Sequence, residues 1–108
     1  MSKQIIQSNK VPAPIGPYSQ AVIANGFLFA SGQIAFDPAT GELVLSSIEA
    51  ETTQVMENIK AILDEANINF ENIVKTSIFL SSMDLFAAVN QVYGSYFNAD
   101  FQAPFFTF

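Results

Sequence analysis

An Asn25-Gly26 pair between two apolar runs is the feature that most constrains how this chain folds. The runs span residues 20–24 and 27–31, and both consist mainly of residue types that suit β-strands. Because Asn and Gly accept a positive φ, the pair favours a tight turn between antiparallel strands. A second surface turn is expected at residues 37–41, where Asp-Pro-Ala-Thr-Gly combines a preset φ with a permissive glycine. The sequence therefore predicts a β-hairpin followed by a chain reversal.

A long amphipathic helix is predicted from Ser46 onward. Apolar side chains recur there at spacings of three and four residues, at Ile48, Val55, Met56, Ile59, Ile62, Leu63 and Ala66. Ser46 and Glu49 match a capping box at its start, and Asn67 can close it in the left-handed conformation. We expect a helix of about five turns.

The second half of the chain repeats the pattern of a strand followed by a helix. Residues 73–80 form a β-branched and aromatic run that suits a buried strand. Ser82 or Asp84 can cap a second helix, whose apolar stripe consists of Phe86, Val89, Val92, Tyr93, Tyr96 and Phe97. Residues 104–108 resemble the opening of a further strand that stops abruptly, so the chain is expected to be cut short.

The order of these elements predicts a two-layer α+β fold. Both helices are expected on one face of a mixed sheet, so the opposite face needs another cover. The chain has 108 residues, half of them hydrophobic, which suits a single domain over residues 1–108. A domain this small buries a modest fraction of its surface, and a partner subunit is the expected cover.

Composition excludes several classes of function. The chain contains no Cys, His or Arg, which argues against disulfides, a transition-metal site and a bidentate carboxylate clamp. Its net charge of −6 argues against nucleic-acid binding. No apolar run is long enough to cross a membrane and the N-terminus lacks a signal-peptide core, so we expect a cytoplasmic protein.

Two segments with turn chemistry are candidates for a ligand site. In residues 13–20, two prolines and a glycine precede a strand and present Tyr18 in a defined direction, although a rigid loop without a function explains the same pattern. Ser31 and Gly32 end a strand with a hydroxyl group and an accessible backbone N–H. A β-bulge at Gly32 is the alternative.

Polar and aromatic residues of the helices give further candidates. Asn90 lies beside Val89 on the second helix, where its amide can orient a substrate or cap backbone groups. Tyr93 and Tyr96 belong to the apolar stripe and are interpreted as core or interface aromatics. Several acidic residues are expected on a solvated helix face, without an acid/base couple: Glu49, Glu51, Glu57, Asp64 and Glu65.

Four segments together resemble the successive signatures of the RidA family, also called the YjgF family. They are residues 15–21, 30–34, 74–79 and 89–97, and both their order and their spacing match. The resemblance extends over nearly the whole chain. It implies a chorismate-mutase-like α+β fold, assembled as a homotrimer with a ligand cleft at each subunit interface.

The resemblance also implies a reaction. Family members hydrolyse reactive enamines and imines such as 2-iminopropanoate and 2-iminobutanoate, which yields 2-oxo acids and ammonia without a cofactor. Tyr18, Ser31, Gly32 and Asn90 match family residues that bind the substrate. No catalytic residue is assigned.

The end of the chain departs from the family pattern. Where the family has Pro-Ala-Arg, this chain has Pro104, Phe105 and Phe106, so the Arg that holds the substrate carboxylate is replaced by Phe106. The family's last two strands, which bring a Glu near the attacking water, are also absent from the sequence. Impaired deaminase activity is therefore expected. The alternatives are a catalytically silent trimer that binds small metabolites, an endoribonuclease or translation inhibitor, which the charge opposes, and a holdase-like interaction protein.

Overall fold

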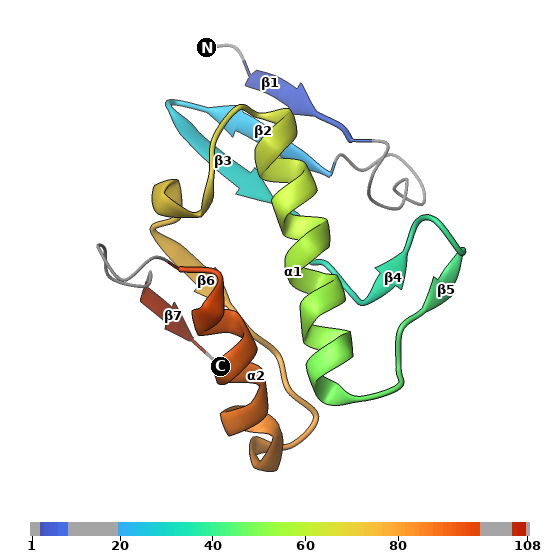
Figure 1. Ribbon diagram of the computed structural model, residues 1–108. Coiled ribbons are helices and arrows are strands. Elements are labelled where there is room, and N and C mark those ends of the chain that lie inside the picture. Colours follow the sequence, from blue (N-terminus) through green and yellow to red (C-terminus); the bar gives the residue numbers. More distant parts are fainter. Residues whose placement is uncertain (1–2, 9–19, 98–104, 108) are drawn as a thin grey trace.

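The computed structural model describes residues 3–8, 20–97 and 105–107 of the chain. Two α-helices and several short strands alternate along it (Figure 1). In chain order, the elements are β1 (Lys3–Ile6), β2 (Ala21–Ala24), β3 (Phe27–Ala30), β4 (Phe36–Asp37), β5 (Glu42–Leu43), α1 (Ile48–Glu65), the 3₁₀ turn η1 (Phe70–Asn72), β6 (Lys75–Ser77), the 3₁₀ turn η2 (Met83–Leu85), α2 (Phe86–Ser95) and β7 (Phe105–Thr107).

The predicted hairpin is confirmed as β2 and β3. Asn25 and Gly26 have φ values of 54° and 79°, the positive values that a two-residue hairpin turn requires at both central residues. Antiparallel β1 pairs with the other edge of β2 and completes a three-stranded sheet. β1 was missed by sequence reasoning because its four residues begin with Lys3 and Gln4 and show no clear alternation.

Helix α1 begins one residue later than the proposed capping box requires. The N-cap is Ser47, whose Oγ accepts a hydrogen bond of 3.0 Å from the backbone N–H of Ala50. The capping box predicted from Ser46 and Glu49 is therefore wrong. Three residues after the actual N-cap, Ser47, stands Ala50, whose methyl group cannot accept a hydrogen bond from the N-cap backbone N–H. At the other end, Asn67 has φ 60° and closes the helix as predicted.

The core lies between α1 and the three-stranded sheet. Figure 1 shows α1 crossing in front of β2 and β3. The buried cluster consists of Ile6, Ala21, Ala61 and Ile62, and the side chains packed against it are Ile23, Leu28 and Ala66. Full burial of one such aliphatic side chain stabilises a fold by about 1.5–3 kcal/mol, so this contact anchors the helix to the sheet.

The second half of the chain differs in detail from its prediction. β6 is limited to three residues, not the run 73–80, and it pairs in parallel with β7. Ser82 caps the turn η2, because its Oγ accepts a bond of 3.2 Å from the backbone N–H of Asp84. α2 then starts at Phe86 without a side-chain cap, so Asp84 does not cap it.

One face of the three-stranded sheet carries exposed apolar side chains in the described part of the chain. Ile5, Val22 and Phe29 are opposite one another in adjacent strands, and they alternate with the core residues, so they lie on the face away from α1. Ile5 is 55% exposed and Phe29 is 62% exposed. The sequence predicted such an uncovered sheet face. In the described part of the chain, no helix is long and apolar enough to cross a membrane.

Candidate functional site

Ser31, which follows β3, is hydrogen-bonded to the backbone of Gln20, the residue that precedes β2. Both its backbone N–H and its hydroxyl donate to the carbonyl oxygen of Gln20, at 2.9 Å and 3.1 Å. The side chain of Ser31 is exposed. Because the hydroxyl proton is committed to Gln20, the oxygen of Ser31 remains available as an acceptor for a ligand.

Gln20 itself is a buried anchor that sequence reasoning placed only at the start of a strand. Its side-chain oxygen accepts a bond of 2.6 Å from the backbone N–H of Ser8, and its Nε2 donates to the carbonyl oxygen of Ser8 at 3.0 Å. The residue is only 4% exposed. The sequence signal for this role was the position of a polar residue directly before Ala21 at the start of a strand. A side-chain amide buried at such a position needs hydrogen-bond partners.

Gly32 follows β3 and leaves its backbone open to approach. The pairing of β2 with β3 runs one to one through Ala30, and Gly32 lies beyond the last paired residue, so the β-bulge stays an alternative. A Cβ atom built on Gly32 meets no heavy atom within 4 Å. No contact within the described chain therefore requires a glycine here, and the absence of a side chain leaves room beside the Gly32 backbone.

Asn90 is not joined to this segment in the described part of the chain. Asn90 is exposed on α2, next to buried Val89, and no hydrogen bond links it to Ser31 or Gly32 in the part of the chain that the structure describes. Tyr18 lies outside the described residues. The structure thus brings Ser31 and Gly32 together and leaves Asn90 on a separate element.

Tyr93 is a core residue, as the sequence indicated. It is buried in α2, and its hydroxyl lies 2.8 Å from Thr76 Oγ1 in β6. Burial raises the pKa of the Tyr93 phenol, and the hydrogen bond with Thr76 opposes this rise. Its ring packs on Phe97 with a centroid distance of 4.9 Å. Tyr93 therefore fastens α2 to β6 and stays protonated at neutral pH.

Tyr96 connects the two helices. Its hydroxyl donates to Glu57 Oε2 of α1 at 2.8 Å, and its ring lies 5.3 Å from that of Phe70. Burial, followed by the hydrogen bond to Glu57 and its negative charge, raises the pKa of Tyr96 to about 12. Both partners are part of the packing between helices, so neither is assigned to the candidate site.

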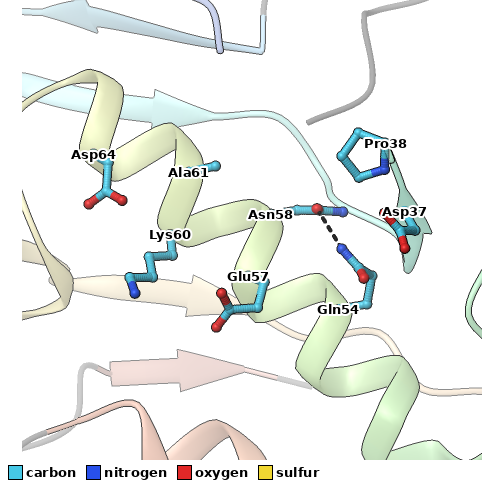
Figure 2. Close-up of a pocket in the computed structure, with 8 residues that line it drawn as sticks. All are labelled: Asp37, Pro38, Gln54, Glu57, Asn58, Lys60, Ala61 and Asp64. Atoms are coloured by element: carbon cyan, nitrogen blue, oxygen red, sulfur yellow. Dashed lines mark hydrogen bonds between the residues drawn. The ribbon is translucent and has the colours of Figure 1, made fainter. Parts of the chain in front are cut away.

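A hollow of about 320 Å³ lies along α1 beside β4 (Figure 2). Its lining residues are Asp37, Pro38, Gln54, Glu57, Asn58, Lys60, Ala61 and Asp64. None of the residues that the sequence singled out for substrate binding lines it. Among residues 3–8, 20–97 and 105–107, no group of three or more His, Cys, Asp or Glu side chains is placed to hold a metal ion.

The candidate site therefore consists of neutral hydrogen-bonding groups. The oxygen of Ser31 can accept a hydrogen bond from an N–H group, and the backbone N–H of Gly32 can donate one to a carbonyl or carboxylate oxygen, whereas the amide of Asn90 lies apart on α2. None of them carries a charge or supplies a strong acid or base at neutral pH. Such an arrangement can bind and polarise a small polar molecule.

The sequence of this chain is similar to those of several known proteins. A family model described as Endoribonuclease L-PSP matches residues 8–107. A RutC family protein of Synechocystis is 50% identical over 99 residues, which cover 91% of this chain and 76% of that protein. A protein from Capra hircus named 2-iminobutanoate/2-iminopropanoate deaminase is 44% identical over 101 residues, which cover 94% of this chain and 74% of that protein.

Solved structures agree with the sequence relatives. The crystal structure of YyfA from Yersinia pestis, a protein of the conserved Rid family, has a TM-score of 0.93 and 42% identity, and the match covers 99% of this chain and 85% of that one. The structure of TdcF from E. coli with bound serine has a TM-score of 0.88 and 32% identity, and covers 96% and 82% of the two chains. These likenesses confirm the expected fold class. This chain belongs to the RidA family.

Proposed function

We propose that this chain forms a cytoplasmic homotrimer that hydrolyses 2-imino acids, such as 2-iminopropanoate and 2-iminobutanoate, to 2-oxo acids and ammonia. The proposal assigns substrate binding to Tyr18, Ser31, Gly32 and Asn90. The observation that carries it is the geometry at Ser31 and Gly32, where a fixed hydroxyl oxygen adjoins an unobstructed glycine backbone. The 44% identity to a protein named as such a deaminase gives the substrate class.

Hydrolysis of an imine requires few groups from the protein. Water adds to the imine carbon, the carbon–nitrogen bond breaks, ammonia leaves, and the carbon becomes the carbonyl of a 2-oxo acid. Neutral donors such as the Gly32 N–H polarise the substrate and hold it in one orientation. No cofactor takes part in this proposal.

The substitution at Phe106 sets the expected rate. Family members hold the substrate carboxylate with an Arg at the corresponding position, whereas this chain contains no Arg at all. A hydrogen bond to a charged group contributes about 1.5–3 kcal/mol, so we expect turnover roughly 10- to 100-fold below that of a relative that has the Arg.

The open sheet face supports the proposed trimer. Ile5, Val22 and Phe29 form one apolar surface, and burial between subunits removes it from water. A cleft at a subunit interface also explains why Asn90 lies apart from Ser31 within one chain, because a neighbouring subunit can bring the two elements together.

A silent binding protein is the second candidate. It is favoured by the absence of any charged group among the assigned residues, and by the serine bound in the TdcF structure. Cleavage or binding of RNA is disfavoured, although the family model bears an endoribonuclease description, because the net charge is −6.

The test measures ammonia release from freshly generated 2-iminopropanoate, with the mass of the purified assembly determined in parallel. Gly32→Ala is the informative variant, since the added methyl group meets no atom of the described residues within 4 Å and is aimed at a ligand or a neighbouring subunit. Gly94→Ala in α2 is the matched control, because a methyl group there also meets no neighbour. We expect acceleration over buffer that Gly32→Ala abolishes and Gly94→Ala retains. Ligand-induced stabilisation without ammonia release would support the silent binder instead.

A further inference from the structure

Asn58 of α1 is the most completely buried polar side chain in the described chain and makes three hydrogen bonds. It is 1% exposed. Its Nδ2 donates to the carbonyl oxygens of Ile34 at 3.1 Å and Phe36 at 2.9 Å, and its Oδ1 accepts from Gln54 Nε2 at 2.9 Å. Figure 2 shows the Asn58 amide extending from α1 toward the segment of Asp37, with Gln54 bonded behind it.

The segment that Asn58 holds forms a tight turn at the start of the short strand β4. The backbone N–H of Phe36 donates to the carbonyl oxygen of Ile34 at 2.8 Å, which closes a tight turn around Ala35. Ala35 is buried, and its carbonyl oxygen accepts from the backbone N–H of Val44 at 2.8 Å. The carbonyl groups of Ile34 and Phe36 therefore both point toward α1, where Asn58 meets them.

Gly32 lies between two fixed points. On one side, Ser31 is bonded twice to the carbonyl oxygen of Gln20. On the other side, Asn58 bridges Ile34 and Phe36. The span between these anchors contains only Gly32 and Gln33, so both anchors restrict the backbone conformation available to Gly32.

We infer that Asn58 is a positioning residue that fixes the direction of the Gly32 backbone N–H toward the substrate, an inference that rests on the proposed function. Binding both the Ile34 and the Phe36 carbonyl oxygen requires a group with two N–H donors. An amide supplies two such donors, whereas a carboxylate or a single hydroxyl group does not. The bond from Gln54 fixes which end of the amide faces the carbonyls.

Asn58→Asp tests this role with a minimal change of shape. The aspartate loses both donors and places a negative charge against two carbonyl oxygens, so the turn at Ala35 should open locally. Asn72→Asp is the matched control, because the exposed Asn72 side chain acts there as an acceptor for the backbone N–H of Asn69, and a carboxylate keeps that bond.

Two measurements on the full chain separate the role from simple destabilisation. Hydrogen exchange by NMR should show the amides of Phe36 and Val44 exchanging about tenfold faster in Asn58→Asp, with core amides such as that of Ile62 unchanged. Titration with 2-oxobutanoate, the stable product of 2-iminobutanoate hydrolysis, should shift the Gly32 amide signal in the wild-type chain. The variant should bind this probe about tenfold more weakly, because fewer molecules hold the competent conformation.

Each result decides the inference. Unchanged exchange at Phe36, or equally faster exchange at Ile62, would overturn it, and so would local opening with undiminished binding of 2-oxobutanoate. If the wild-type chain does not bind 2-oxobutanoate, the proposed function fails, while exchange still reports whether Asn58 fixes the segment. If Asn58→Asp does not fold, Gln54→Met provides a milder loss of the same network, with the same local opening expected.

Discussion

Replacing Tyr96 by Phe should change how the stability of this protein depends on pH. In the folded chain, burial and the contact with Glu57 raise the pKa of Tyr96 to about 12, whereas the unfolded chain ionises near the ordinary phenol value of about 10. A raised pKa means that the folded state resists loss of the proton. The stabilisation is therefore complete below about pH 10 and is lost as the pH rises from about 10 to 12.

The expected change in the free energy of unfolding follows from the size of the pKa shift and from the exposure of Tyr96 and Glu57 to water. Two pKa units correspond to about 2.7 kcal/mol at full strength. Tyr96 is only partly buried and Glu57 is exposed, so water screens their interaction and we expect on the order of 1 kcal/mol. At neutral pH, Tyr96→Phe should cost about 1 kcal/mol for the lost hydrogen bond of 2.8 Å.

Urea unfolding of both proteins over a pH series measures this effect. The difference in the free energy of unfolding between wild type and Tyr96→Phe should shrink by about 1 kcal/mol between about pH 9 and 11.5. Tyr93 is present in both proteins, so its own raised pKa cancels in the difference. A difference that stays constant across this range would refute the reasoning.

Further predictions address the core, the turn and the open face. Ile62→Val should lower the free energy of unfolding by about 0.5–1.5 kcal/mol and Ile62→Ala by about 2–5 kcal/mol in urea titrations, because the side chain is 1% exposed. Gly26→Ala should cost about 1–2 kcal/mol in the same assay, since its φ of 79° disfavours a Cβ atom. Phe29→Glu should reduce the molar mass measured by light scattering to that of a single chain, and a trimer that persists would contradict the proposed interface.

Local chemistry explains why much of the fold was predictable. The hairpin depends on Asn25 and Gly26, which carry their conformational preference with them in any context. The long helix depends on a stripe of apolar residues that ends at Asn67, whose left-handed conformation the structure confirms. Both features are decided within a few residues of sequence, so no distant contact was needed to foresee them.

The remaining features depend on distant partners. β6 pairs with β7 over three residues, and this pairing joins segments far apart in the sequence. Asn58 was overlooked although it falls three residues after Val55 and four before Ile62, on the apolar stripe of its helix. A polar residue on such a stripe indicates a buried partner, but the partners, Ile34 and Phe36, are 24 and 22 residues away.

Two buried amides hold the backbone on either side of the proposed site at Ser31 and Gly32. Gln20 holds Ser8 and directs its own carbonyl to Ser31, while Asn58 holds the other end of the segment around Gly32. Neither amide needs to touch a ligand, and both are less than 5% exposed. A site built from neutral donors gains little from electrostatic attraction, so its affinity depends on holding those donors in place before the ligand arrives. Loss of either amide should therefore weaken binding more than loss of any exposed charge on α1.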